Sequence, residues 1–434
     1  MKILRYPSAA ADKKMRAIIG RDIDFRKADV QAVTRILNDV KRNGDNALIR
    51  YCQAFDAPHM TIETLAVTPE EMAAARTKVD RAFMQALNRA AAQIDLFHRQ
   101  QLPKSWIDTR RPGTLLGQMV NPVDAAGVYV PGGKGGNTPL VSSVLMGAIP
   151  AKIAGVPKVV MVTPPMPSGE VAPHLLVAAK KVGVDAVYKV GSAWAIGALA
   201  YGTETLPKVN VIVGPGNIFV TLAKKIVAGT VGIDMIAGPS EILIVADGTA
   251  DPEYIAADLL SQAEHDPLAS AILVTDSAEL AQSVNTAVEI QLAALSRVDI
   301  ARQSLSAFGA ILVVENLDIA IQLANHIAPE HLELQVAEPM DVAPRIRNAG
   351  AIFLGPYTPE PVGDYMAGPN HVLPTAGTAR FSSALSVDHF MKKTSLIRYS
   401  QSAFRKEARD IICLATVEGL GGHAHAIQVR LSKT

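Results

Sequence analysis

The stretch Gly127-Val128-Tyr129-Val130-Pro131-Gly132-Gly133 is a short apolar run that ends in a glycine turn. A run of this kind is typical of a buried strand. Further short strands are plausible at residues 158–162, 186–190 and 210–213, and segments with helical character separate them. Because strands that alternate with helices indicate βαβ units, we predict an α/β fold with a mainly parallel sheet.

A second alternating series begins at residue 241 and continues at residues 271–275, 310–314, 332–336 and 351–354. Before residue 127 the pattern is instead helical: Val33, Leu37 and Val40 repeat with the period of a buried helix face, and Gly44 follows as a stop. The domains we predict are an N-terminal extension at 1–24, a first α/β domain of 25–127 with 239–380, a second of 128–238, and a tail domain at 381–434. Such a short tail is expected to pack on the body of the protein or on a partner subunit.

Length and composition narrow the classes of protein. A chain of 434 residues is too long for one ordinary core, and 49% hydrophobic with only 5% aromatic residues suits helices packed on parallel strands. The net charge of +1 and the absence of a dense basic run give no reason to expect a nucleic-acid partner. No apolar run approaches the roughly 20 residues of a membrane span. Cys52 and Cys413 form no disulfide framework, and the N-terminus lacks a secretory signal, so we expect a cytoplasmic protein.

Two glycine-rich turns are candidates for binding a phosphate or a dinucleotide. They are Pro131-Gly132-Gly133-Lys134-Gly135-Gly136 and Gly214-Pro215-Gly216-Asn217, the second between an expected strand and a helix. Glycines there let backbone N–H groups approach an anion at a helix N-terminus. Neither turn matches the GxGxxG fingerprint, and glycines that only make tight turns would look the same.

A metal site is suggested by polar residues that are remote from one another in the sequence. Asp251-Pro252-Glu253 has the form of a helix start, and Gln262 and His265 then share one face of that helix. Gln262, His265, Asp364 and His423 together would offer two oxygen and two nitrogen ligands, which suits zinc in an open site, although manganese or cobalt could compete. Taken singly, each residue could also have a purely structural role, in a solvated helix cap, in a turn or in a flexible tail.

Glu330 and His331 are adjacent, in a turn just before an expected strand. Neighbouring residues in a turn can diverge and serve as separate proton-transfer groups, while the alternative is a capping glutamate beside a surface histidine. His371 and Glu418 lie beside further turns and are open to both interpretations.

The chain resembles the histidinol dehydrogenase family over nearly its whole length. Besides the two strand-and-turn segments at 127–133 and 214–217, the matching blocks are Ala237-Gly238-Pro239-Ser240-Glu241, Ser261-Gln262-Ala263-Glu264-His265, Ala328-Pro329-Glu330-His331-Leu332, Gly363-Asp364-Tyr365, Gly368-Pro369-Asn370-His371-Val372-Leu373-Pro374 and Glu418-Gly419-Leu420. The resemblance implies two incomplete Rossmann-like domains and oxidation of L-histidinol to L-histidine through the aldehyde, with two NAD, in the last two steps of histidine biosynthesis.

The resemblance also implies roles for individual residues. One zinc per subunit would be held by Gln262, His265 and Asp364, with His423 from the other subunit of a homodimer. Glu330 and His331 would be the acid/base residues. The remaining assignments are substrate contacts by Ser240, His371 and Glu418, shared with His331 and the metal ligands, and NAD contacts by Tyr129 and Asn217.

Two departures from the family affect the expected cofactor side. Trp194 stands where the family usually has glutamine, and the loop Lys134-Gly135-Gly136-Asn137-Thr138 differs from the usual one. We expect Trp194 to pack against the nicotinamide or adenine region. Two other functions remain open: a related dehydrogenase of another small alcohol, such as a sulfonated diol, and a zinc hydrolase in which Glu330 activates water.

Overall fold

The computed structural model describes residues 1–21, 25–132 and 138–432. The chain divides into two units, one of residues 1–101 with 124–390 and one of residues 102–123 with 391–434. Among the described residues, no helix is both long and apolar enough to cross a membrane.

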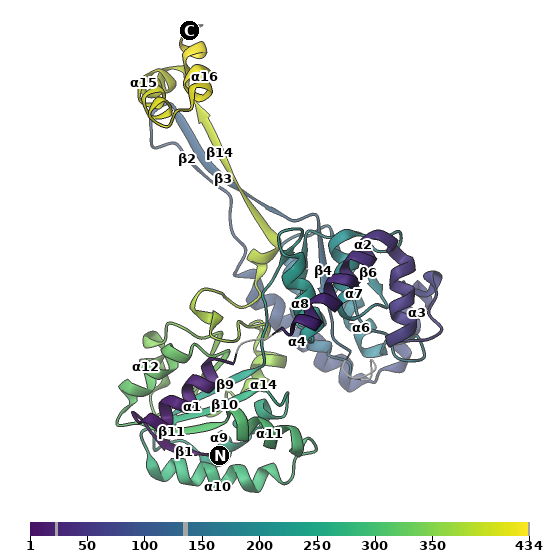
Figure 1. Ribbon diagram of the computed structural model, residues 1–434, viewed down its shortest axis with the longest axis vertical. Coiled ribbons are helices and arrows are strands. Elements are labelled where there is room, and N and C mark those ends of the chain that lie inside the picture. The colour runs from purple at the N-terminus through teal and green to yellow at the C-terminus, as the bar shows by residue number, and fades with distance from the viewer. Residues whose placement is uncertain (22–24, 133–137, 433–434) are drawn as a thin grey trace. The chain divides into compact units, whose positions relative to one another are not determined.

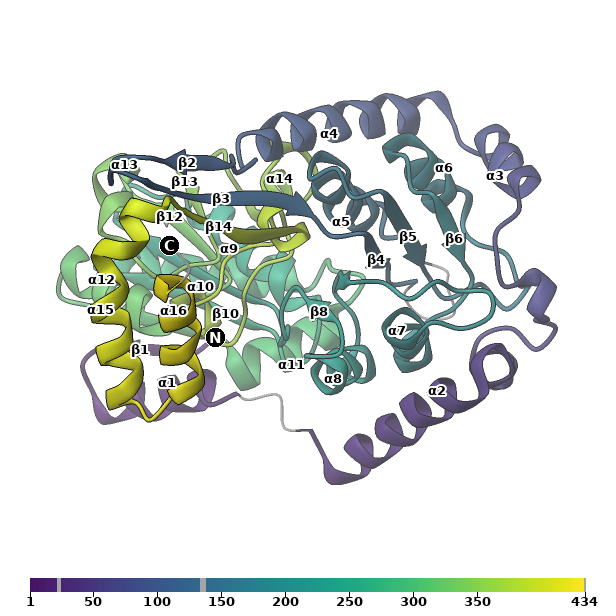
Figure 2. The same ribbon diagram turned by 90° about the horizontal axis from the view of Figure 1, so that it is seen from above.

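The first unit contains a six-stranded parallel sheet. In spatial order its strands are β1 (Ile3–Arg5), β11 (Ala310–Val313), β10 (Ser270–Thr275), β9 (Glu241–Ala246), β12 (His331–Gln335) and β13 (Ala351–Leu354). Successive side chains of a strand point to opposite faces. Leu243 and Val245 accordingly pack with α1 (Ala9–Ile19) and α12 (Leu317–Ile327), while Ile242 and Ile244 pack with α9 (Pro252–Ala263), α10 (Ala278–Leu292) and α11 (Val298–Phe308). Figure 1 and Figure 2 show these helices on the two faces of the sheet.

The same unit contains a five-stranded parallel sheet. Its strands in spatial order are β6 (Ala186–Tyr188), β5 (Lys158–Val162), β4 (Ala125–Tyr129), β7 (Val211–Val213) and β8 (Gly232–Ile233). The helices between its strands are α5 (Val141–Ile153), α6 (Pro173–Val182), α7 (Ser192–Tyr201) and α8 (Ile218–Val227). The predicted α/β class with mainly parallel sheets is confirmed.

The N-terminal segments pack differently from the sequence-based expectation. Residues 1–24 were predicted as an extension, but β1 lies at an edge of the six-stranded sheet and α1 buries Ala11, Met15 and Ile18 in its core. The helices α2 (Lys27–Phe55), α3 (Pro69–Ala75) and α4 (Arg81–Arg99) were grouped with 239–380, yet they pack on helices of the five-stranded sheet. Helical periodicity shows which face is buried, not which sheet covers it, and this is the reason for the difference.

Gly44 interrupts α2 but does not end it. Its φ of 49° and ψ of −131° are not helical, and the chain continues as a helix to Phe55. Glycine suits this backbone conformation, and a Cβ here, 2.2 Å from the carboxylate of Glu204, would also require that flexible side chain to move.

The second unit is a three-stranded antiparallel sheet with two helices. The strand β14 (Met391–Tyr399) pairs along its whole length with β3 (Thr114–Pro122), which also pairs with β2 (Trp106–Asp108). The helices α15 (Gln401–Val417) and α16 (Gly421–Ser432) pack on each other. The tail domain predicted at 381–434 therefore begins later and includes a hairpin from 102–123, because β14 finds its hydrogen-bonding partner there.

Candidate active site

Two strands of the six-stranded sheet bring polar residues to one edge. Glu241 begins β9 and His331 begins β12, and both strands run parallel, so their amino ends meet. Glu330 precedes β12 directly and accepts a hydrogen bond at 2.9 Å from the backbone N–H of Glu241. The Nδ1 of His331 lies 3.0 Å from the carbonyl oxygen of Glu241. Since a carbonyl can only accept, Nδ1 carries the proton, and Nε2 of the neutral ring has a free lone pair.

The helix α9 returns from the far end of β9 to this same edge. Asp251 caps its N-terminus and accepts from the backbone N–H of Glu253, as the sequence predicted. Its last turn carries Gln262, which is completely buried, and both polar atoms of the Gln262 amide lack a partner among the described residues. Unpaired buried amide atoms are costly, so a bound ligand or an ordered water is needed to satisfy them. His265 lies two residues beyond the end of α9 and is exposed, so it does not share a helix face with the buried Gln262 as predicted. It still interacts electrostatically with His331.

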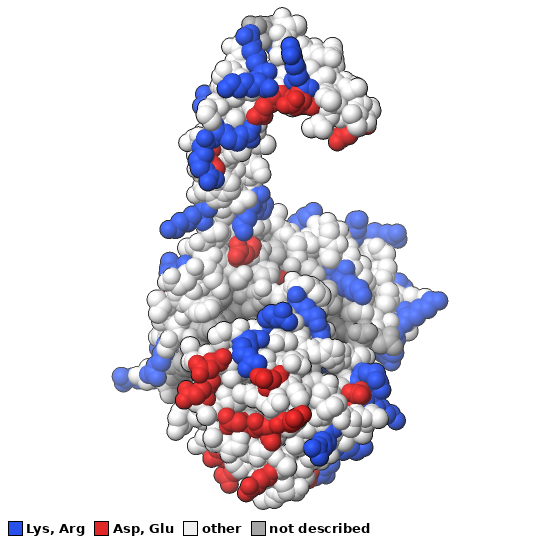
Figure 3. All heavy atoms as spheres, turned by 90° about the vertical axis from the view of Figure 1, so that its left-hand side faces the viewer, with Lys and Arg blue, Asp and Glu red and all other residues white. Residues whose placement is uncertain are grey.

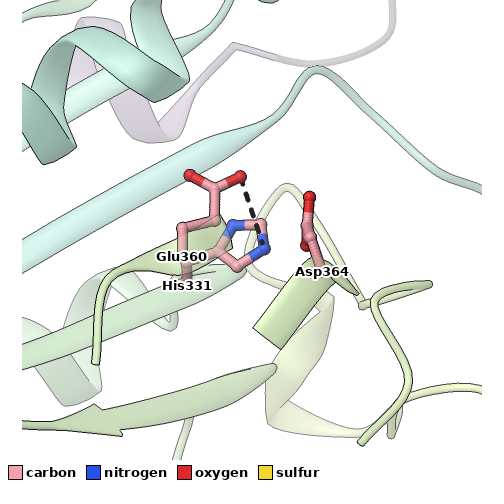
Figure 4. A group of neighbouring side chains, drawn as sticks. All are labelled: His331, Glu360 and Asp364. Carbon is pink, nitrogen blue, oxygen red and sulfur yellow. Dashed lines mark ion pairs between the residues drawn. The ribbon is translucent and has the colours of Figure 1, made fainter. Parts of the chain in front are cut away.

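Two further carboxylates come from the segment after β13. Glu360 lies in the short helix α14 (Glu360–Val362), and Asp364 lies one turn later in the π-helical turn η5 (Gly363–Ala367). The Nε2 of His331 is 3.9 Å from a Glu360 oxygen, and the nearest ligand atoms of His331, Glu360 and Asp364 all lie within 4.8 Å of one another (Figure 4). This geometry is compatible with a bound metal ion.

Burial controls the protonation of these groups. Removal from water raises the pKa of Glu330 well above its ordinary value, raises that of Glu360 to about 8 and lowers that of His331 to about 4. Nearby carboxylates add to the increase for Glu330 and Glu360. Several carboxyl groups confined together, each of which resists ionisation, form an environment in which a divalent cation would be stabilised.

A small cavity adjoins the cluster. It measures about 110 Å³, and His331, Asp364 and His371 are among the residues that line it. The Nε2 of His371 is buried without a partner among the described residues, and burial lowers the pKa of this imidazole. Ser240 directly precedes Glu241 at the same edge and is half-buried. His331, Asp364 and His371 therefore share one cavity.

The two residues predicted to contact NAD lie at the carboxyl edge of the five-stranded sheet. Tyr129 ends β4 and is buried, and its hydroxyl accepts from the backbone N–H of Ser192 at 3.1 Å. Asn217 is exposed and caps α8, because its side-chain oxygen accepts from the N–H groups of Phe219 and Val220. Residues 133–137, in the other glycine-rich turn and the divergent loop, lie outside the described residues.

Trp194 is buried in α7, with 5% of its surface exposed. Tyr51 and Phe55 of α2 both stack on its indole, with ring centroids 5.5 and 5.6 Å away. This packing accounts for the aromatic residue, and contact with a cofactor stays a prediction.

Glu418 and His423 belong to the second unit. Glu418 caps the C-terminus of α15, His423 lies in the first turn of α16, and both side chains are exposed. Their contribution to a site shared between subunits stays a prediction.

Figure 3 shows Lys and Arg interspersed with Asp and Glu on the face it draws, with acidic side chains gathered over part of the first unit.

Sequence reasoning missed three residues of the cluster. Glu360 stands four positions before Asp364, a spacing that places both on one side of a helical turn and was a usable signal. Glu241 stands out in the sequence only as the last residue of the block Ala237-Gly238-Pro239-Ser240-Glu241. Arg21, which donates to Glu241 at 2.6 Å, gave no local signal, since its partner is 220 positions away.

Comparison with known proteins gives consistent matches. The family model described as histidinol dehydrogenase matches residues 21–431. The chain is 58% identical over 400 residues to a histidinol dehydrogenase from Desulfotalea psychrophila, with 92% of each chain covered. It is 52% identical to one from Syntrophotalea carbinolica, with 99% of each covered. The crystal structure of histidinol dehydrogenase from Elizabethkingia anophelis has a TM-score of 0.93 at 37% identity and covers 100% of this chain and 98% of that one.

Proposed function

The chain belongs to the histidinol dehydrogenase family of oxidoreductases, and we propose that it oxidises L-histidinol to L-histidine through the aldehyde, with NAD as the oxidant and one zinc ion per subunit. The observation that carries this proposal is the cluster at the amino edge of the six-stranded sheet. His331, an imidazole with a free lone pair, lines the cavity there together with Asp364 and His371, and the Nε2 of His371 has no partner among the described residues. The buried Glu330 directly precedes His331.

The residues present fit zinc. The buried Gln262 amide has no protein partner among the described residues, and a carboxylate oxygen of Asp364 lies within 4.8 Å of a ring nitrogen of His331. Gln262, His265 and Asp364 would hold the ion, and His423 of a second subunit would complete the set. All four are nitrogen or oxygen donors, as zinc in an open catalytic site accepts. Bound zinc would attract the substrate's imidazole and amine, and bound NAD would accept hydride.

His331 is suited to the alcohol step. Its Nδ1–H is fixed on the carbonyl of Glu241, so Nε2 faces the cavity side with its lone pair. A pKa lowered to about 4 by burial keeps the ring neutral, and a neutral ring can accept the hydroxyl proton as hydride leaves the substrate.

Glu330 is suited to the aldehyde step. The aldehyde must be hydrated before a second hydride can leave, and a carboxylate with a raised pKa is a stronger base toward water than an ordinary one. The N–H of Glu241 orients this carboxylate at 2.9 Å. Ser240, His371 and Glu418 would contact the substrate.

The homodimer and the cytoplasmic location are part of the proposal. His423 and Glu418 are exposed in the second unit, which leaves them free to enter the site of another subunit. The location rests on the two cysteines, which are unpaired, as is usual in a reducing compartment.

The test is turnover of zinc-loaded protein with L-histidinol and NAD, followed by NADH absorbance. Two NADH formed per L-histidinol, with L-histidine as product, would support the proposal. A single NADH per substrate would remove the aldehyde step. Oxidation of a sulfonated diol but not of L-histidinol would instead identify the protein as a related dehydrogenase with a different substrate.

A further inference from the structure

A buried ion pair lies beneath the second glycine-rich turn. Lys224 of α8 pairs with Asp234, which follows β8, and their side chains are 4% and 0% exposed. The ammonium of Lys224 also donates to the carbonyl of Gly214 at 3.0 Å. The carboxylate of Asp234 accepts from the N–H of Gly214 at 2.8 Å and from that of Met235 at 2.6 Å. The two charges therefore hold both polar groups of Gly214.

Gly214 is the residue at which the chain leaves β7 for this turn. Its φ of +112° lies in the region that favours glycine, and a Cβ here would lie 2.1 Å from the carbonyl oxygen of Tyr129. The turn is thus pressed against the end of β4, where Tyr129 is located. A change in the orientation of the Gly214 peptides would move Pro215, Gly216 and Asn217 with it.

The rest of the turn has polar groups that can bind a ligand. The side-chain oxygen of Asn217 caps α8, so the amide nitrogen of this side chain is left to donate a hydrogen bond to a ligand. Within the described parts of the chain, the backbone N–H groups of Gly216 and Asn217 have no hydrogen-bond acceptor. Free N–H groups at the start of a helix attract anionic groups of a ligand.

Stability alone does not account for the ion pair. Burying two charges costs solvation energy, and apolar residues of similar size are often at least as stabilising. Apolar residues cannot hydrogen-bond to both the N–H and the C=O of Gly214.

We propose that Lys224 and Asp234 are positioning residues for the cofactor: they hold the 214–217 turn in the conformation that receives NAD. This inference rests on the proposed function. It adds two residues that contact the turn from below and need not touch the cofactor.

The test compares two paired variants that leave no unpaired buried charge. Lys224→Met with Asp234→Leu removes every contact to Gly214, whereas Lys224→Met with Asp234→Asn keeps one acceptor for its N–H. A control is Lys152→Met with Asp185→Leu, a more exposed pair whose side chains are 29% and 41% exposed. That Lys–Asp pair, 2.7 Å apart, also holds a backbone N–H of the five-stranded sheet, but at the opposite edge.

Calorimetry would give the dissociation constants for NAD and, separately, for L-histidinol on zinc-loaded protein. We expect the Leu variant to bind NAD about tenfold more weakly or worse, the Asn variant to recover part of the loss, and the control to bind normally. L-Histidinol affinity should stay within about twofold in all of them, because its site is on the other sheet. NAD affinity in the Leu variant equal to that of the control would overturn the inference.

Hydrogen–deuterium exchange on the unmodified protein provides a second measurement if a variant fails to fold. NAD should slow exchange at residues 214–220, and L-histidinol alone should not. If wild-type protein bound NAD without any such slowing, the inference about the 214–217 turn would be overturned, but the proposed function would stand. Wild-type protein that bound L-histidinol but no NAD would overturn the proposed cofactor as well.

Discussion

The guanidinium of Arg21 donates a hydrogen bond to the carboxylate of Glu241 at 2.6 Å, and both side chains are almost completely buried. Arg21 follows α1, in a segment that the sequence suggested was peripheral. Glu241 in turn holds Glu330 through its N–H and His331 through its carbonyl. The N-terminal segment thus supports the two proposed acid/base residues through one intermediary.

Arg21→Met is expected to destabilise the protein strongly. Removing one partner leaves the Glu241 charge buried and uncompensated, which typically costs about 3–5 kcal/mol in free energy of unfolding. Urea denaturation would measure this cost. The control is Arg26→Met, which breaks an ion pair whose arginine is 76% exposed and should lower the free energy of unfolding far less. Equal losses in the two variants would contradict the assigned role of Arg21.

Glu330→Gln is expected to separate the two oxidation steps. The amide oxygen can still accept from the N–H of Glu241, so the geometry is kept while the base is lost. With the aldehyde as substrate the rate should fall by about 10²–10⁴-fold, whereas formation of the first NADH from L-histidinol in a single turnover should change much less. Rapid-mixing absorbance measures both. If both steps slowed alike, Glu330 would not be specific to hydration.

Mixing two inactive variants tests the shared site. His423→Asn and Asp364→Asn should each abolish activity, because each removes a proposed zinc ligand. If His423 serves the other subunit, a dimer with one chain of each kind has one intact site, so random reassociation should restore about a quarter of wild-type activity. Absence of any recovery, with mixed dimers confirmed by mass, would show that each subunit uses its own His423.

Asp56 should make stability depend on pH. Burial raises the pKa of this carboxyl to about 7 in the folded chain, against about 4 when it is unfolded. Between these values the folded state binds the additional proton, so the contribution to stability is complete below pH 4 and is lost as the pH rises through 7. Asp56→Asn should therefore become more stable relative to wild type from pH 5 to pH 8. Parallel urea-denaturation midpoints across that range would disprove it.

Trp194→Gln tests the residue that departs from the family. Loss of stacking on Tyr51 and Phe55 should lower the free energy of unfolding by about 3–5 kcal/mol, the usual cost of removing a buried large aromatic side chain. NAD affinity, measured by calorimetry on the folded variant, is expected to change as well. An unchanged affinity would eliminate the proposed contact between Trp194 and the cofactor.

Local pattern was sufficient for the fold class and for much of the element order. Apolar runs of four to six residues marked the strands, and the predicted helix start at Asp251 agrees with the structure. His331, expected in the turn before a strand, is instead the first residue of that strand. These features depend on neighbours in the sequence. The predicted grouping of 25–127 with 239–380 differs from the structure. The apolar face of a helix does not indicate which sheet it packs on.

By itself, therefore, the sequence determined the two series of parallel strands, the glycine turns that follow two of them and the family to which the chain belongs. Only the tertiary structure decided that Arg21, Glu241, Glu330 and Glu360 meet at the amino edge of one sheet, and that Lys224 and Asp234 hold Gly214. The physical reason is that buried charges need partners, and those partners are brought close by strand order and helix packing across long stretches of chain.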